Sequence, residues 1–286
     1  MTASELMPVV FLGHGSPMNA LDDNRYTRAW RAIGAATPRP RAILVVSAHW
    51  YIGYTAVTAM ERPSTIHDFF GFPEPLFALQ YSAPGAPDVA KEVVEAVKPR
   101  WAGLDRDSWG IDHGAWSVLV HLFPDADIPV LQMSINAFKE PDYHLDLAAR
   151  LAPLRKRGVM IVASGNVVHN LRRLDMRKPD AASDWARRFD DAAREIMTTA
   201  PGNILSLQGH ADYAMAVPTP DHYLPLLYVA ALADQAGTPA RVLVDGYFAG
   251  GISMTAYGLD IACPAENTGG PGAPLPAETP PEQTNL

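Results

Sequence analysis

Residues 41–50 read RAILVVSAHW, an apolar run that ends in a serine and a histidine. Val and Ile favour strands, and a continuous apolar run of this length is typical of a strand that is buried on both faces. Similar runs occupy residues 9–12 and 158–163, and each is followed by a histidine within a few residues. The pattern predicts a largely parallel sheet whose strands are followed by histidines.

Helical patterns alternate with these strands along the chain, which indicates an α/β fold. Strands are predicted at residues 9–12, 41–47, 55–60, 128–135, 158–163, 241–245 and 252–257. Helices are predicted at residues 24–34, 87–97, 141–156, 183–199 and 222–233. Since no linker or internal repeat divides the body, we expect a single domain with a central, mostly parallel or mixed sheet flanked by helices.

The 286 residues divide by composition into a globular body, residues 1–263, and a C-terminal tail, residues 264–286. The tail is rich in Pro and Gly and has almost no large apolar residues, so we expect it to be disordered and without a catalytic role. Residues 61–87 are rich in Pro, Gly and aromatic residues. This stretch is expected to be a long ordered crossover that either roofs a pocket or packs on its own aromatic side chains.

Composition also excludes several classes of protein. A formal net charge of −8 argues against a nucleic-acid partner. The single cysteine, Cys263, permits no intramolecular disulfide and no thiolate-based metal site, so any metal must be held by His, Asp or Glu. The apolar run at residues 7–12 is too short for a signal peptide or a membrane span. We therefore expect a cytoplasmic protein with no membrane partner.

Three histidines, His14, His49 and His169, follow predicted strands. Ligands bind open α/β sheets at the carboxyl ends of the strands, so these imidazoles are expected to converge on one site. A single histidine in such a place is more often a hydrogen-bonded structural residue, but three together favour a shared site. His222, at the start of a predicted helix, would complete a His-rich metal centre.

Two further histidines lie among aromatic residues. His113 is in WGIDHGAW, expected to be a loop, and His67 is in TIHDFFGF. Both suit a planar substrate as well as they suit simple packing. The sequence contains no nucleotide-phosphate cradle, no GxSxG nucleophile motif and no HExxH motif. The remaining interpretation is a metalloenzyme whose site is dominated by imidazoles.

Six motifs, in order along the chain, resemble the bacterial 4,5-DOPA extradiol dioxygenases, which belong to the class III, LigB-type ring-cleaving dioxygenases. The motifs are FLGHGSPMN, VVSAHW, TIHDFFGFP, WGIDHGAW, ASGNVVHN and TPDHYLPLLY, and the resemblance extends over residues 9–257. It implies an α/β fold with a non-haem Fe(II) site that opens a catechol ring beside, rather than between, its two hydroxyls. In that family DOPA becomes a seco-DOPA that cyclises to betalamic acid or muscaflavin.

The resemblance implies that His14 and His49 are metal ligands and that His169 is either a ligand or the active-site base. His222 stands where the wider superfamily has a ligating Glu, so the expected site is all imidazole, and Zn(II) suits it as readily as Fe(II). If His14, His49 and His222 hold octahedral iron, three positions remain for two catechol oxygens and O₂. This count favours His169 as a base.

The remaining candidate roles concern the substrate. His113 is expected to act as a second acid or hydrogen-bond donor, and His67 and Ser16 are candidates for substrate contacts. Besides a catechol dioxygenase, two other classes of function stay open: a zinc hydrolase that lowers the pKa of bound water with the same imidazoles, and a non-catalytic metal-binding protein. Fe(II)-dependent oxygen uptake would distinguish the first class from the other two.

Overall fold

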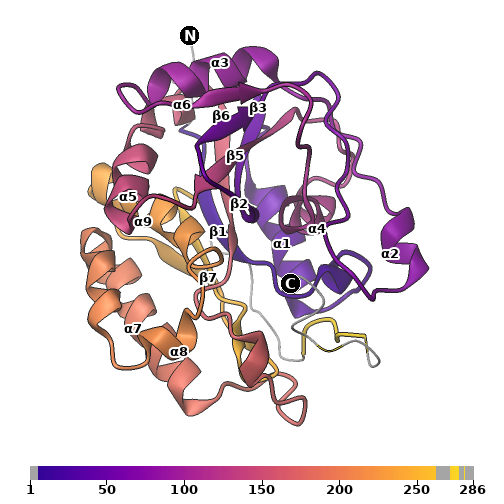
Figure 1. Ribbon diagram of the computed structural model, residues 1–286, viewed down its shortest axis with the longest axis vertical. Helices are drawn as coiled ribbons and strands as arrows, with labels where there is room; N and C mark the ends of the chain where they lie inside the picture. The colour runs from indigo at the N-terminus through magenta and orange to yellow at the C-terminus, as the bar shows by residue number, and fades with distance from the viewer. Residues whose placement is uncertain (1–5, 262–270, 277–279, 281–286) are drawn as a thin grey trace.

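A computed structural model describes residues 6–261, 271–276 and 280 of the chain. Its main sheet has eight strands in the order β4-β3-β5-β2-β6-β1-β10-β7 (Figure 1). The strands are β1 (Val9–Gly13), β2 (Ala42–Ile52), β3 (Ala56–Thr58), β4 (Gly103–Asp105), β5 (Val130–Asn136), β6 (Val159–Gly165), β7 (Arg241–Val244) and β10 (Ala256–Leu259). Helices flank this sheet, so the predicted single α/β domain is confirmed.

The centre of the sheet is parallel and its edges are mixed. Strand β2 pairs in parallel with β5 and with β6, and β6 pairs in parallel with β1. Strand β10 is antiparallel to both β1 and β7, and β3 is antiparallel to β5. Gly13 of β1 is in register with Gly165 of β6, so these two strands end side by side. Parallel pairing therefore brings distant segments to one edge of the sheet.

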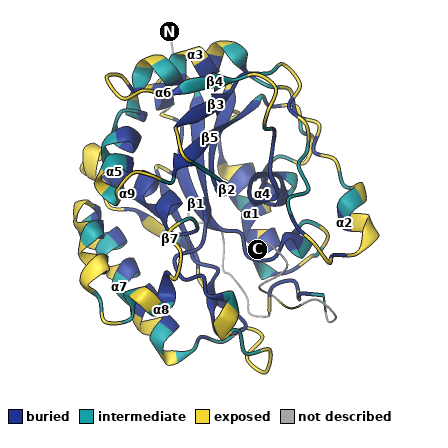
Figure 2. Cartoon of the chain, in the orientation of Figure 1, coloured by how far each residue is buried: buried dark blue, intermediate teal, exposed yellow. Residues whose placement is uncertain are grey.

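Alternating side chains of the central strands supply two hydrophobic cores, one on each face. Phe11 belongs to the core covered by α3 (Pro87–Ala96), α5 (Pro141–Ala149), α7 (Asp184–Thr199) and α9 (Leu224–Ala236). Leu12 belongs to the opposite core, which α1 (Arg25–Ala36) and α4 (His113–Leu122) cover. The central strands are mostly buried, whereas exposed residues gather on the outer helices and loops (Figure 2). Because helices cover both faces of the sheet, both faces of the central strands are buried, which explains why their sequences are continuously apolar.

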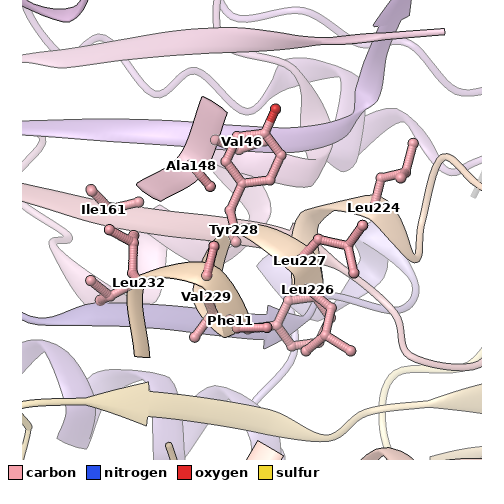
Figure 3. Close-up of a cluster of buried hydrophobic side chains, with 14 of the residues drawn as sticks. Phe11, Val46, Ala148, Ile161, Leu224, Leu226, Leu227, Tyr228, Val229 and Leu232 are labelled. Carbon is pink, nitrogen blue, oxygen red and sulfur yellow. The ribbon is translucent and has the colours of Figure 1, made fainter. Parts of the chain in front are cut away.

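Helix α9 is apolar on nearly every side and packs on the middle of the sheet. Figure 3 shows side chains of this helix, among them Val229 and Leu232, in one cluster with Phe11 of β1 and Ile161 of β6. Burial of each such side chain contributes about 1.5–3 kcal/mol to folding. This packing holds the start of α9, and the residues just before it, against the carboxyl ends of the strands.

Short elements complete the described chain. They are η1 (Pro17–Ala20), α2 (Glu74–Ala78), α6 (Ala152–Arg155), η2 (Leu171–Arg173), η3 (Pro201–Gly209), α8 (Tyr213–Ala216), β8 (Tyr247–Phe248) and β9 (Ile252–Ser253). The predicted helix at 141–156 is two helices, because Pro153 lacks the N–H that would continue α5 and instead opens α6. The predicted strand at 252–257 is also two strands, since β9 turns away to pair with β8.

Most of the tail, residues 264–286, lies outside the described residues, so its predicted disorder stays a prediction. Its described part, residues 271–276, lies against the body: the Ala273 amide donates to Asn19 Oδ1 at 3.0 Å, and the Leu275 side chain is buried. Among the described residues, no helix combines the length and the hydropathy that a bilayer crossing requires.

Candidate metal centre

The strand ends bring the predicted histidines together. His14 follows directly after β1. His49 lies inside β2, which extends beyond the predicted end at residue 47, at a register shift between β2 and β5. Such irregularities re-aim a side chain, which explains how a residue within a strand faces the site. His222 lies just before α9.

Three of the imidazoles bring ligand atoms close together, and the ring of His222 lies beside them. Nε2 of His49 lies 3.2 Å from Nε2 of His14. The ring of His222 has its centroid 5.3 Å from that of His14 and 5.0 Å from that of His49. His14, His49 and His113 each offer one ligand atom, and these three atoms lie within 4.8 Å of one another. The structure therefore adds His113 to the possible ligands.

His113 is not in a loop, as predicted, but is the first residue of α4. Asp112 caps this helix by accepting from the Ala115 amide at 3.1 Å. The His113 ring lies 3.8 Å from the ring of His49 and meets the edge of Phe69 at 5.5 Å. The helix escaped prediction because it is buried on almost every side and so has no amphipathic pattern.

A hydrogen-bond relay sets the tautomer of His14. The Ser164 hydroxyl donates to the Gly114 carbonyl at 2.5 Å, and its oxygen lies 2.9 Å from Nδ1 of His14. Since the single hydroxyl proton is already used, Ser164 accepts from His14 Nδ1–H. The lone pair of His14 is then on Nε2, the atom that faces His49.

Asp68 positions two of the imidazoles at once. Its Oδ1 lies 2.9 Å from Nδ1 of His113 and its Oδ2 lies 3.4 Å from Nδ1 of His49. Burial acts to raise the pKa of Asp68, but the neighbouring His113 holds it well below its usual range. The carboxylate therefore orients both rings with Nδ1 outward and Nε2 toward the centre. Sequence reasoning missed Asp68, although its position next to His67 in TIHDFF was a visible signal.

Asp221 plays the same part for His222, whose Nδ1 is hydrogen-bonded to the carboxylate. Nε2 of His222 and Nε2 of His113 are buried and have no hydrogen-bond partner among the described residues. A buried polar atom without a partner is costly, and a cation bound within the cluster would give such an atom a partner. Together with the facing Nε2 atoms of His14 and His49, this donor set fits a metal ion.

Burial also keeps three of these imidazoles, His14, His49 and His169, neutral. It lowers the pKa of His14, His49 and His169 well below the usual value, and the neighbouring imidazoles lower it further. Neutral imidazoles carry the lone pairs that a metal requires.

His169 stands on the open side of this cluster. Its ring stacks on the ring of His222 with a centroid distance of 3.6 Å and an interplanar angle of 1°. Both rings line a pocket of about 640 Å³, together with His49, Tyr51 and Arg172. His169 can therefore meet a molecule that enters from the solvent.

The expected substrate contacts His67 and Ser16 do not line this pocket. Nε2 of His67 is 2.9 Å from the Leu79 carbonyl, and the ring packs near Trp116. Ser16 Oγ accepts from the Met18 amide at 3.2 Å, which caps η1. These contacts are structural, and the two substrate roles stay predictions.

Residues 61–87 form neither a roof over this pocket nor a crossover packed only on itself. They contribute none of its lining residues. Instead Asp68 and Phe69 reach the far side of the cluster and contact His113. The stretch therefore supports the imidazoles from behind.

Residues 8–259 match the family described as "Catalytic LigB subunit of aromatic ring-opening dioxygenase". The chain belongs to the LigB family. It is 46% identical over 256 residues to the protein named 4,5-DOPA dioxygenase extradiol in Escherichia coli (strain K12), covering 88% of this chain and 94% of that protein. The identity to the Beta vulgaris protein of the same name is 32% over 255 residues, covering 86% and 94%.

A crystal structure of an uncharacterized protein from Escherichia coli K12 superposes with a TM-score of 0.78 and 42% identity, covering 88% of this LigB-family chain and 99% of that one. The predicted family is confirmed. So is the predicted enzyme class, an extradiol ring-cleavage dioxygenase that depends on a metal. This membership decides among the three functional hypotheses and sets the zinc hydrolase and the non-catalytic metal-binding protein aside.

Proposed function

We propose that this LigB-family enzyme binds Fe(II) and cleaves the ring of a catechol, with L-DOPA as the substrate. The observation that supports the proposal is a cluster of buried imidazoles beside an open pocket, in which ligand atoms of His14, His49 and His113 lie within 4.8 Å of one another. The relatives named 4,5-DOPA dioxygenase extradiol support the choice of substrate.

His14, His49 and His222 would hold the metal, as the strand-end pattern predicts. When bound there, Fe(II) would supply a redox-active centre with room for both catechol oxygens and O₂, whereas Zn(II) would fit the same donors without redox chemistry. Asp68, Ser164 and Asp221 keep the donor rings in the required tautomers. The orientation of the donor rings is thus set by contacts that already exist within the chain.

His169 would take the proton that the catechol loses on binding, since it is neutral and faces the pocket. His113 would accept a hydrogen bond from a substrate hydroxyl on the opposite, buried side through its unpaired Nε2, because its Nδ1 faces the Asp68 carboxylate. Both oxygen atoms of O₂ would enter the product, because the carbon–carbon bond beside the diol becomes an aldehyde and a carboxylic acid. With L-DOPA this product is a seco-DOPA, whose amine condenses with the aldehyde and releases water to give betalamic acid or muscaflavin.

The test is anaerobic reconstitution with Fe(II), followed by addition of L-DOPA and O₂. We expect one O₂ consumed per catechol and a visible absorption band from the cyclised product. If the Fe(II)-loaded protein takes up no oxygen with any catechol, the proposal is overturned. Mass spectrometry with ¹⁸O₂ adds the control, since both labelled atoms should appear in the ring-opened product before water exchange.

A further inference from the structure

The pocket beside the metal centre is lined by side chains of different chemistry and burial. Its imidazoles His169 and His222 are buried, whereas its Arg172 is exposed. A catechol whose hydroxyls reach the imidazoles would leave its side chain among the other lining residues. Arg172 is therefore a candidate to select among catechols by their side chains.

Arg172 brings a positive charge that nothing in the described chain neutralises. Among the residues that the structure describes, no acidic side chain forms an ion pair or hydrogen bond with it, whereas Arg177 pairs with Asp175 at 2.8 Å and Arg188 with Asp212 at 2.8 Å. The acid that shares the pocket, Asp221, is already bonded to His222. A guanidinium without a partner is suited to binding a carboxylate through two parallel hydrogen bonds.

The backbone that carries Arg172 is anchored to its surroundings. The Asn170 amide donates to the Gly251 carbonyl at 3.0 Å, and the Asn170 side chain donates to the Met215 carbonyl at 2.8 Å. Next to it, the His169 amide donates to the Ala216 carbonyl at 2.9 Å. The spacing between the imidazole of His169 and the start of the Arg172 side chain is thus fixed by the fold.

We propose that Arg172 binds a carboxylate on the substrate's side chain, so that the enzyme prefers catechols with a short acidic side chain over neutral or amine-only catechols. This proposal rests on the proposed catechol cleavage and specifies its substrate class. A cationic amine alone would be repelled by Arg172. An amino acid would be accepted through its carboxylate.

The experiment compares Arg172→Gln with Arg172→Lys and with Arg173→Gln, a matched control because Arg173 is exposed on the same element, η2, and does not line the pocket. The substrates are L-DOPA and 3,4-dihydroxyphenylpropionate, which carry a carboxylate, and DOPA methyl ester, dopamine and 4-methylcatechol, which do not. Loss of one charge-assisted contact predicts a fall in kcat/KM of roughly 10- to 100-fold for the two acids in Arg172→Gln, mostly through KM. We expect partial recovery in Arg172→Lys and little change in Arg173→Gln or with uncharged catechols.

Anaerobic titration of the Fe(II)-loaded protein with dihydroxyphenylpropionate and 4-methylcatechol gives a second readout that does not require turnover. The wild type should bind the acid more tightly, and Arg172→Gln should lose that preference. Equal losses for all catechols, or an unchanged preference for the acid, would overturn the role of Arg172. Absence of ring cleavage in the wild type, with the binding preference intact, would instead overturn only the proposed reaction.

Discussion

The histidines of the metal centre are oriented by side chains that are not themselves expected to bind the metal. Ser164 and Asp221 are hydrogen-bonded to Nδ1 atoms of His14 and His222, and Asp68 lies 2.9 Å from Nδ1 of His113. Each partner can therefore be removed without removing a donor atom. This separation makes the roles of the side chains testable one at a time.

His14→Ala, His49→Ala and His222→Ala should each lose bound metal and nearly all turnover. Each replacement removes one of the Nε2 atoms expected to hold the ion, and the substrate then has no route to activation. Metal content by elemental analysis after Fe(II) loading and desalting measures the effect. Full occupancy in one of these variants would remove that residue from the ligand set.

Replacement of His169 by Ala should leave iron in place and reduce turnover by about 10²–10⁴-fold, the usual effect of losing a positioned base. His113→Gln should do the same if the residue hydrogen-bonds the substrate. Because the ligand atoms of His113, His14 and His49 lie within 4.8 Å of one another, its iron content is the deciding measurement. Loss of iron in either variant would mark that residue as a ligand.

Asp68→Asn should weaken metal binding by roughly 10- to 100-fold without removing a ligand, since second-layer hydrogen bonds orient and polarise the donors. The carboxylate serves His49 and His113 together, so the loss should exceed that in a variant such as His67→Gln, whose ring bonds the Leu79 carbonyl. Competition titration with a chelator measures both affinities. Equal affinity in Asp68→Asn and the wild type would contradict the assigned role.

At the scale of elements, close backbone approach explains how α4 reaches the site. A Cβ at Gly114 would lie 2.6 Å from His49 Cδ2 and 2.6 Å from Ser47 Oγ. Only glycine leaves space for the first turn of α4 to press against β2 and place His113 beside His49. The motif WGIDHGAW is therefore as much a packing motif as a chemical one.

The contact between α5 and α9 predicts a pH dependence of stability. His144 of α5 is buried with Nδ1 3.2 Å from the Tyr228 hydroxyl of α9, and burial lowers its pKa from 6.5 to about 4. A lowered histidine pKa means that the unfolded chain binds the proton first, so this residue's contribution to stability is present above pH 6.5 and is lost as pH falls toward 4. The slope is at most about 1.4 kcal/mol per pH unit.

Urea unfolding at several pH values between 4.5 and 7.5 tests this prediction. The lowered pKa values of His14, His49, His121 and His169 contribute the same sign, so the quantity of interest is the difference between the wild type and His144→Gln. We expect the free energy of unfolding of the variant to fall less steeply on acidification. Tyr228→Phe is the control, because it removes the hydrogen bond but leaves the titrating ring. Parallel curves for His144→Gln and the wild type would show that His144 does not titrate as expected.

At the scale of the whole molecule, the metal should stabilise the fold. Unpaired buried nitrogens on His113 and His222 are a cost in the metal-free chain, and a ligand that binds only the folded state adds about 2.7 kcal/mol at 100 times its Kd. We expect Fe(II) and Zn(II) each to raise Tm by several degrees, and His14→Ala to abolish the rise.

Only the Fe(II) protein should take up oxygen, since zinc has no accessible redox change. Equal oxygen uptake with both metals would refute the iron assignment.

Local sequence patterns were sufficient for most of the architecture. The apolar runs at 41–50 and 158–163 predicted the central parallel strands, because strands buried on both faces read as continuous apolar segments. The histidines near the ends of such runs predicted a shared site at one edge of the sheet. Six motifs in order predicted the family, which was confirmed over residues 8–259.

Other features depended on contacts between segments far apart in the chain. Helix α4 has no polar face, so the period that marks a surface helix is absent, and its His113 was expected in a loop. Asp68 and Ser164 acquire their roles only when the crossover and β6 reach His113 and His14, at separations of 45 and 150 residues. The placement of Arg172 in the pocket lining likewise follows from hydrogen bonds of the preceding His169 and Asn170 to distant carbonyls. The strand pattern alone determined that imidazoles gather at the sheet edge, because the apolar composition of each segment already specifies a buried strand. Tertiary structure decided how the imidazoles are oriented, because orientation requires hydrogen-bonding partners from elsewhere in the chain.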